Sequence, residues 1–474
     1  MKAEKFLIGN DFELSDSIVD IKNPYSNEIV KKVYKSLTGH VNKSLDYLSS
    51  VFPKYKSVPT YIKSELLSKI SKKVSDRKEE LAKLITLETG KPIKFSRIEV
   101  ERAVLTFQLG SEEAKRIEGE ALNLDLLKGS EGKNGIVKRF PVGIIFAITP
   151  WNFPINLVAH KLSPALASGN VVLLKPASAS LCCGIELGKI VKEASEECGL
   201  DFSPVNVITS SGGEIEQFLG DERVKMISFT GSPLVGWGLK KHTNIQKLSL
   251  ELGGNAGVIV DESADVKSAA AKIAIGGFAQ AGQSCISVQR VFIHKNLYSD
   301  FKNHIIEEAQ NIKFGNPNDD DTMVGPMINE GEAKRVEEWI HEAKSSDAKI
   351  LTGGERKSAM ISPTVIEDAD KKLNVNAKEV FAPVITLNIF EDFKEAVKEV
   401  NNSDFGLQAG IFTNNFANAM YAYENIETGG VIINDVSSYR MDSMPYGGVK
   451  QSGNSREGIK YAIEEMTERK IMVY

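Results

Sequence analysis

The first regular pattern along the chain is helical. Apolar residues recur every three or four positions between about 60 and 120, for example in residues 64–70 and 81–85. This spacing is typical of amphipathic helices, whose apolar face packs against a core. A further helical stretch is expected at residues 184–197.

Strand patterns begin near Gly135. Residues 142–148 form a continuous apolar run, rich in β-branched side chains, which predicts a buried strand of a parallel sheet. The runs at 171–174 and 225–229 have the same character. Because helical stretches lie between these strands, the pattern predicts right-handed βαβ units and an α/β fold.

A second alternation of strands and helices starts at residues 256–260 and continues to 431–434. A chain of 474 residues is also too long for one ordinary hydrophobic core. The pattern therefore predicts two α/β domains, each built around its own sheet.

Composition and charge exclude several classes of protein. Hydrophobic residues make up 42% and charged residues 26%, which is ordinary for a soluble globular protein. The formal net charge of −5 disfavours a nucleic-acid partner, which would require a concentrated basic face. No apolar run is long enough for a membrane span, and residues 1–5 do not begin a secretory signal. Neither a nucleic acid nor a membrane is therefore expected as a partner.

The cysteines form no metal-type CxxC pair, so no metal site is predicted. They are Cys182, Cys183, Cys198 and Cys285. The adjacent Cys182 and Cys183 are expected to be packed thiols. A free reactive thiol fits a reducing compartment, and a cytoplasmic location is expected.

Two segments carry residues suited to chemistry on a carbonyl group. Cys285 follows the small residues of Gly282-Gln283-Ser284, and Glu251 opens a Gly-flanked segment upstream. A thiolate is a good nucleophile, and a carboxylate can deprotonate a thiol or a water. Either segment alone is weak evidence, because a buried cysteine is usually inert and a Gly-Gly pair is usually a turn.

Further motifs accompany these two segments. The ordered blocks are residues 149–154, 174–178, 229–236, 251–255, 282–285, 379–384 and 445–453. In this order and spacing the chain closely resembles the aldehyde dehydrogenase superfamily, from about Asn23 to Glu468. The lactaldehyde dehydrogenases and the non-phosphorylating glyceraldehyde-3-phosphate dehydrogenases are the most similar branch.

The resemblance implies catalytic roles for four residues. Cys285 is the expected nucleophile, and Glu251 is the base that activates water. The rigid turn around Asn152 presents an amide to a developing oxyanion, together with the backbone N–H of Cys285. Glu457 matches a glutamate proposed in the family to relay protons.

The glycine-containing segment from Gly231 to Gly236 is expected to approach a pyrophosphate. It follows a predicted strand and opens a helix, whose N-terminus favours an anion. Its spacing differs from the usual dinucleotide motif, so by motif alone a plain strand–helix turn is equally compatible. The resemblance assigns the dinucleotide to this segment. The expected cofactor-binding residues are Thr149, Pro150, Trp151, Lys175, Ser178, Gly212, Thr230, Gly231, Ser232, Gly236, Leu252, Glu379 and Phe381.

The cofactor is expected to be NADP, and NAD is also possible. In the family, the lysine at Lys175 binds the adenosine ribose, and NAD-preferring members often have a glutamate where this chain has Ser178. A carboxylate there would repel a 2′-phosphate, whereas a serine does not. Glu379 matches the family's nicotinamide-ribose ligand, and Phe381 is expected beside the ring.

The implied reaction is the NAD(P)-dependent oxidation of a small aliphatic hydroxyaldehyde, such as lactaldehyde or glyceraldehyde, through a thiohemiacetal and a thioester. Hydrolysis is favoured over phosphorylating or CoA-acylating chemistry because Glu251 is present. Candidate substrate contacts are Phe153 and Arg440. A phosphorylated substrate would require further cations, for which Arg290 and Arg116 are the candidates. The sequence is also compatible with succinate-semialdehyde oxidation, and with a catalytically silent relative that serves as a binding or structural protein.

The resemblance also implies a domain plan: two doubly wound domains, a Rossmann-like cofactor-binding domain and a catalytic domain, with a small β-extension. Residues 1–121 and 143–252 would form the cofactor-binding domain, and 253–438 the catalytic domain. Residues 439–459 would return to the cofactor-binding domain. The extension, residues 122–142 and 460–474, would expose strand edges and so support a homodimer or homotetramer.

Overall fold

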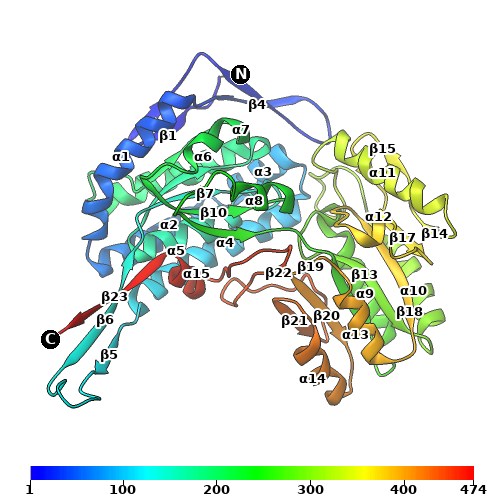
Figure 1. Ribbon diagram of the computed structural model, residues 1–474. Coiled ribbons are helices and arrows are strands. Elements are labelled where there is room, and N and C mark those ends of the chain that lie inside the picture. Colours follow the sequence, from blue (N-terminus) through cyan, green and yellow to red (C-terminus); the bar gives the residue numbers. More distant parts are fainter. Residues whose placement is uncertain (1) are drawn as a thin grey trace.

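Two seven-stranded sheets, both mostly parallel, organise the chain (Figure 1). The computed structural model describes residues 2–474 and confirms the predicted α/β class. The first sheet has the order β11-β10-β7-β8-β9-β1-β2. Its strands are β1 (Phe6–Ile8), β2 (Asp11–Glu13), β7 (Ile144–Ile148), β8 (Val171–Lys175), β9 (Val205–Val207), β10 (Val224–Thr230) and β11 (Lys247–Glu251).

Helices cover both faces of the first sheet and share one continuous apolar core with it. They are α1 (Thr38–Lys56), α2 (Thr60–Asp76), α3 (Lys78–Thr89), α4 (Ile93–Glu113), α5 (Asn156–Ser168), α6 (Leu181–Glu197) and the short α7 (Gly212–Ile215) and α8 (Pro233–Leu239). The helical periodicity between 60 and 120 therefore corresponds to α2, α3 and α4. Strand β7 is fully buried, as its continuous apolar run predicts.

The register of the first sheet brings several predicted site residues to one edge. Ile148 pairs with Lys175 and with Phe229, and Thr230 pairs with Glu251. These residues stand at the carboxyl ends of parallel strands, where open α/β sheets bind ligands.

The second sheet has the order β14-β17-β18-β13-β12-β20-β21, and its core is separate from that of the first sheet. Its strands are β12 (Ala256–Val260), β13 (Val288–His294), β14 (Lys349–Thr352), β17 (Thr364–Glu367), β18 (Val384–Phe390), β20 (Gln408–Phe412) and β21 (Gly430–Ile433). Its helices are α9 (Val266–Phe278), α10 (Tyr298–Asn311), α11 (Glu330–Lys344), α12 (Asn374–Ala377), α13 (Phe393–Asn401) and α14 (Phe416–Asn425).

A three-stranded antiparallel sheet projects from the first domain, at the lower left of Figure 1. It contains β5 (Glu120–Asn123), β6 (Asn134–Pro141) and the C-terminal β23 (Thr467–Val473). The segment 460–474, expected to belong wholly to this extension, starts with most of α15 (Ile459–Glu465). That helix packs on α5 and α4 of the first domain, because its apolar residues complete the first core.

The segment before α15 connects both domains. Its strand β22 (Val449–Lys450) pairs with β19 (Phe405–Gly406) of the second domain, and Gly453 forms a bridge with Glu251 of the first. Two further short pairs are β3 (Ile18–Lys22) with β4 (Ile29–Tyr34), and β15 (Arg356–Lys357) with β16 (Met360–Ile361). Along residues 2–474, no helix combines the length and apolar character needed to cross a membrane.

Candidate active site

A cavity of about 790 Å³ opens at the carboxyl edge of the first sheet and is lined by residues of both domains. The residues predicted as catalytic, cofactor-binding or direct substrate contacts all line it except Gly236. A Cβ at Gly236 would lie 2.3 Å from Leu252 Cδ2, so this glycine permits α8 to pack closely on the sheet. Gly236 lies beneath the cavity wall, and its contact with the cofactor stays a prediction.

The loop that carries Cys285 has an unusual backbone. After α9, Gln280 and Ala281 have φ values of 56° and 57°, in the left-handed region that side chains rarely adopt. Gly282 follows with a φ of 64°, and a Cβ there would lie 2.1 Å from the Ala382 carbonyl oxygen. Such strained conformations concentrate at functional sites. Here they turn the chain so that Cys285 faces the cavity.

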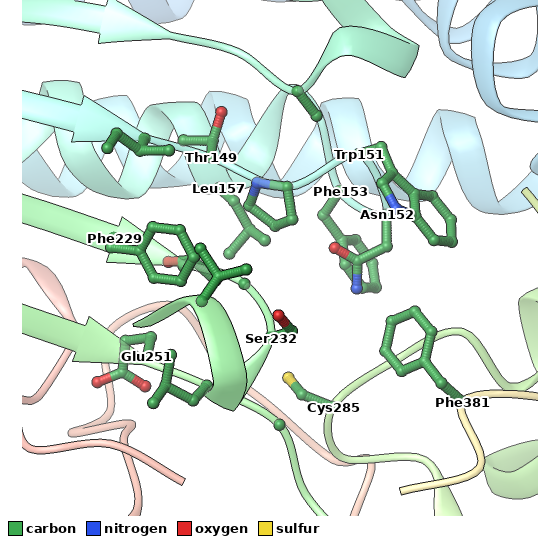
Figure 2. Close-up of a pocket in the computed structure, with 18 of the residues that line it drawn as sticks. Thr149, Trp151, Asn152, Phe153, Leu157, Phe229, Ser232, Glu251, Cys285 and Phe381 are labelled. Carbon is green, nitrogen blue, oxygen red and sulfur yellow. The ribbon is translucent and has the colours of Figure 1, made fainter. Parts of the chain in front are cut away.

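Asn152 reaches the same space from the loop between β7 and α5. Figure 2 shows its amide and the sulfur of Cys285 pointing toward one another, with Phe381 on one side and Glu251 on the other. The Asn152 Nδ2 donates to the Gln283 carbonyl at 3.1 Å. Its carbonyl oxygen Oδ1 is buried and has no partner among the described residues.

Cys285 is held as a thiol in the resting protein. Burial raises the pKa of the Cys285 thiol to about 12, although the hydrogen bond with Tyr446 lowers it. The distance from Cys285 Sγ to Tyr446 Oη is 2.9 Å. An inert thiol at rest must therefore lose a proton before it can act as a nucleophile.

Glu251 and Glu457 form a buried carboxyl pair whose pKa values are shifted in opposite directions. Burial and the nearby Glu457 hold the pKa of Glu251 well above its usual range. By contrast, burial of Glu457 is outweighed by the combined charges of Arg440, His160 and Lys161, which lower its pKa to about 2. Glu251 Oε1 accepts a hydrogen bond from Ser455 Oγ at 3.1 Å, while Arg440 Nη2 donates to Glu457 Oε2 at 2.8 Å. One carboxyl is thus poised to exchange a proton while its neighbour stays ionised.

Lys161 lies beside this pair, on α5. Its ammonium is 3.8 Å from Glu457 Oε1 and donates to Ser228 Oγ at 3.0 Å. Burial lowers its pKa, and the charges of Glu457 and Glu251 oppose that effect. The result is a chain of ionisable groups leading away from Glu251.

A second polar network borders the cavity. Asp442 accepts two hydrogen bonds from Arg102, at 2.7 and 3.1 Å, and lies 2.8 Å from His160 Nε2. Despite burial, these partners hold the pKa of Asp442 below its usual range. Arg102 lines the cavity with a side chain that is 25% exposed. Arg102 is therefore a cation at the cavity wall that is already paired with Asp442.

The other half of the cavity contains groups suited to a dinucleotide. Burial lowers the pKa of Lys175 to about 8, and its ammonium donates to the Pro176 carbonyl at 3.1 Å. Ser178 is exposed nearby, and the hydroxyls of Thr149 and Thr230 are buried with no partner among the described residues. Unpaired polar groups beside a cavity are costly unless a ligand completes them.

Glu379 lies close to the loop after β11. Burial raises its pKa to about 7, and its Oε1 accepts a hydrogen bond from the Gly254 N–H at 2.8 Å. A Cβ at Gly253 would lie 2.3 Å from Glu379 Oε2, so glycine is needed for this approach. Phe381 meets Trp151 edge-on, with ring centroids 5.8 Å apart. An acidic group and two aromatic rings thus lie next to Cys285. This combination of groups fits a nicotinamide riboside.

Arg290 and Arg116, the two further cations suggested for a phosphorylated substrate, both lie outside the cavity. The prediction that they could contact such a substrate was therefore wrong. Arg290 is buried in the second domain, where its guanidinium donates to the Asn255 and Val400 carbonyls. Arg116 is exposed and pairs with Glu112 and Glu113. The first is a structural residue and the second lies on a helix surface, so neither can hold a substrate phosphate in this cavity.

Several residues of the site carried no signal in the sequence. They are Arg102, His160, Lys161, Arg335 and, inside a motif but without a role, Tyr446. Their neighbours along the chain are ordinary helical or loop residues. Only the fold brings them to the cavity or, for His160 and Lys161, to the charged groups beside it. Across the described residues, no three His, Cys, Asp or Glu side chains come together as a metal site.

The profile of the aldehyde dehydrogenase family matches residues 12–472, and the chain belongs to this family. It is therefore an NAD(P)-dependent aldehyde dehydrogenase, an oxidoreductase. The predicted family and enzyme class are confirmed.

Relatives with named activities match over most of the chain, and two of them illustrate the range. The chain is 43% identical over 478 residues to a 3-sulfolactaldehyde dehydrogenase of Priestia megaterium, covering 100% of this chain and 98% of the relative. It is 37% identical over 458 residues to a lactaldehyde dehydrogenase of Methanococcus aeolicus, covering 96% and 97%.

Two solved structures share the fold closely. Aldehyde dehydrogenase 21 of Physcomitrella patens, in complex with the reaction product succinate, has a TM-score of 0.97 at 41% identity, covering 100% of this chain and 98% of that one. The glyceraldehyde-3-phosphate dehydrogenase GapN of Methanocaldococcus jannaschii, complexed with NADP, has a TM-score of 0.93 at 37% identity, covering 96% and 98%. Binding of NADP, and also of NAD, is consistent with such neighbours.

Proposed function

We propose that this enzyme oxidises small aliphatic hydroxyaldehydes to carboxylic acids through a thioester on Cys285. The observation that carries the proposal is the convergence of Cys285, Asn152 and Glu251 on one cavity. The relatives named as lactaldehyde and 3-sulfolactaldehyde dehydrogenases support a hydroxyaldehyde substrate. Lactaldehyde and glyceraldehyde are therefore the first substrates to test.

In the first step Cys285 loses its proton to the carboxylate of Glu251. The thiolate then forms a bond to the aldehyde carbon, and the carbonyl π electrons move onto oxygen. The Asn152 amide and the backbone N–H of Cys285 donate hydrogen bonds to this oxyanion. One such donor contributes about 2.7–4 kcal/mol to transition-state stabilisation.

When bound, the dinucleotide supplies the hydride acceptor, so the oxidised carbon remains on Cys285 as a thioester. Lys175 and Ser178 would hold the adenosine ribose and its 2′-phosphate. Glu379 would hold the nicotinamide ribose, with Phe381 beside the ring. The remaining predicted cofactor residues, apart from Gly236, line the same cavity between these two ends.

The proton that Glu251 took from Cys285 passes to solvent before deacylation, which restores the carboxylate. Glu251 then takes a proton from a water molecule, whose oxygen attacks the thioester. The carbon–sulfur bond breaks and the thiolate of Cys285 is released with the acid product. Glu457 and Lys161 lie in line behind Glu251 and would carry its proton away.

The decisive experiment measures reduced-cofactor absorbance with lactaldehyde, glyceraldehyde and buffer alone. Cys285→Ala should abolish turnover, while Cys198→Ala, the matched control outside the cavity, should retain it. Glu251→Gln should accumulate an acyl-enzyme, detected by intact-protein mass spectrometry after a single turnover. Full activity of Cys285→Ala would refute the thioester route, and inactivity of the wild-type protein with every aldehyde would favour a catalytically silent relative.

An aldehyde with an anionic substituent is the second candidate substrate. Arg102 favours it, because this partly exposed cation lines the cavity. 3-Sulfolactaldehyde, glyceraldehyde 3-phosphate and succinate semialdehyde each carry such a group. Arg102→Met should raise KM for these three while leaving KM for lactaldehyde unchanged; an equal effect on all four would reject the anion-binding role.

The thiol chemistry also bears on location. Cys285 must remain reduced to act as a nucleophile, and a reducing compartment such as the cytoplasm preserves it. We therefore propose a cytoplasmic enzyme. Fractionation of the source cells followed by immunoblotting tests this.

A further inference from the structure

The hydroxyl of Tyr446 has a single hydrogen-bond partner within residues 2–474, and that partner is Cys285. The Oη–Sγ distance is 2.9 Å, and Tyr446 is only 4% exposed. Tyr446 stands in the loop before β22, far from Cys285 in sequence. A buried phenol aimed at the proposed nucleophile has no evident structural purpose there, since its ring alone would fill the same space.

The surroundings of Tyr446 fix its position. Its backbone exchanges two hydrogen bonds with Glu457, at 3.1 and 2.6 Å, and its ring packs with Ile286 and Leu407. The guanidinium of Arg440 lies over the ring, 3.7 Å from the centroid. This cation–π contact and the backbone bridge hold the hydroxyl toward Cys285.

Tyr446 is suited to donate its proton in a hydrogen bond without losing it. Burial, followed by the charge of Cys285, holds the pKa of the Tyr446 phenol well above its usual range. A neutral phenol offers one O–H donor. A hydrogen bond from a neutral donor to an ionised sulfur is stronger than one between two neutral groups.

We propose that Tyr446 is a catalytic residue whose hydroxyl donates a hydrogen bond to the Cys285 thiolate, both before it attacks the aldehyde and when it leaves the thioester. This inference rests on the proposed function, because it takes Cys285 as the nucleophile. No proton leaves Tyr446 in either step. In the thiohemiacetal and the thioester the sulfur is bonded to carbon and uncharged, so the hydrogen bond is strongest where the thiolate exists.

The other charged groups around Cys285 divide into two sets. Arg440 favours the thiolate, whereas Glu379 and Glu251 disfavour it by charge repulsion. Burial disfavours it most of all. The Tyr446 hydroxyl is the largest of the favourable influences. Its removal should therefore make the thiolate harder to form.

The test measures how fast iodoacetamide alkylates Cys285 as a function of pH, with peptide mass spectrometry to separate it from the other cysteines. Tyr446→Phe removes only the hydroxyl and keeps the ring under Arg440. We expect the apparent pKa of Cys285 to rise and its alkylation at a fixed pH near neutrality to slow about tenfold, because the thiolate is harder to form. Tyr423→Phe, an exposed tyrosine on α14, is the matched control and should behave as the wild type.

A second variant should shift the apparent pKa of Cys285 in the opposite direction. Site-specific 3,5-difluorotyrosine at position 446 makes the phenol a stronger donor, so the apparent pKa of Cys285 should fall. An unchanged profile in both variants would overturn the proposal, and so would a shift of the same sign in both. Thermal unfolding of each variant verifies that it is folded.

The alkylation assay uses neither aldehyde nor dinucleotide, so it separates this inference from the proposed function. If the wild-type protein oxidises no aldehyde but the two variants shift in opposite directions, the proposed function fails and the hydrogen bond to the thiolate stands. If aldehydes are oxidised but the profile does not move, only the role of Tyr446 fails. In an active enzyme, Tyr446→Phe should also lower kcat/KM about tenfold at neutral pH, matching the loss of thiolate.

Discussion

The side-chain amide of Asn152 donates a hydrogen bond to the backbone carbonyl of Gln283, two residues before Cys285, at 3.1 Å. In return, the Gln280 side chain donates to the Asn152 backbone carbonyl oxygen at 2.8 Å. These reciprocal bonds join a loop of the first domain to a loop of the second. They set the distance between the proposed oxyanion donor and the nucleophile, so catalysis depends on how the two domains meet.

Replacing Asn152 by alanine should lower kcat/KM by about 10²–10³-fold, equivalent to ~2.7–4 kcal/mol, because an oxyanion donor is lost. Steady-state kinetics with lactaldehyde check this. Asn318→Ala, at an exposed loop position, serves as the control. Wild-type kcat/KM in Asn152→Ala would exclude the oxyanion role.

In Glu457→Gln, the deacylation rate should begin to fall at a lower pH than in the wild type, so that the acid limb of its pH profile moves to lower pH. Below its raised pKa, Glu251 carries a proton and cannot take one from water, so the rate falls as the pH falls. Removing the charge of Glu457 removes a repulsion and leaves Lys161 and Arg440 free to favour the Glu251 carboxylate. Single-turnover acid release across pH measures the shift.

The control for that experiment is Glu464→Gln, since Glu464 is a half-exposed carboxylate on α15. Its acid limb should coincide with that of the wild type. A shift of Glu457→Gln toward higher pH would contradict the assigned electrostatic coupling.

Ser178→Glu should reduce kcat/KM with NADP at least tenfold, about 1.4 kcal/mol, while sparing NAD. The added carboxylate would repel the 2′-phosphate. Ser178→Gln adds a side chain of the same size as glutamate without the charge and is the control. A wild-type enzyme that favours NAD more than about tenfold would contradict the expected cofactor preference.

Binding of NADP should weaken as the pH rises through about 8, where Lys175 loses its charge. Below that value the ammonium can pair with the 2′-phosphate, and above it the pair is lost. KM for NADP should therefore rise across this range more than KM for NAD. In Lys175→Met the difference between the two pH profiles should disappear; its persistence would assign the titration to another group.

Glu99→Gln should destabilise the protein by about 3–5 kcal/mol, because it leaves the buried Lys91 ammonium without its partner. Glu99 also accepts hydrogen bonds from the Ile155 and Asn156 N–H groups at 2.8 and 3.2 Å, at the start of α5. The double variant Lys91→Met/Glu99→Gln should recover part of the loss. Urea unfolding measures both, and equal stability of Glu99→Gln and the wild type would be the contrary result.

Light scattering should give a multiple of 52.0 kDa, a homodimer or homotetramer. The outer strands β5 and β23 present free edges, and Ile471, Met472 and Val473 are exposed there. Such an edge favours pairing with another chain. A mass of one chain at micromolar concentration would contradict the expectation, and Met472→Pro should reduce assembly if β23 is the contact.

Local pattern by itself was sufficient for several central strands of the two sheets and for the helices between residues 60 and 120 and at 184–197. The continuous apolar runs at 142–148 and 171–174 became the buried strands β7 and β8, because a strand covered on both faces has no polar side. The ordered motifs were sufficient for the family, since Cys285 and Glu251 lie within contiguous segments of characteristic composition.

Only the tertiary structure decided which distant residues act on those motifs. Tyr446 meets Cys285, and Arg102 meets Asp442, across separations in sequence that no periodicity encodes. The tertiary structure likewise places Gly236 below the cavity wall and Arg290 in the interior of the second domain. A charge or hydrogen bond acts over a few ångströms in space, whereas sequence pattern reports only neighbours along the chain, so the electrostatics of the site became visible when the two domains came together.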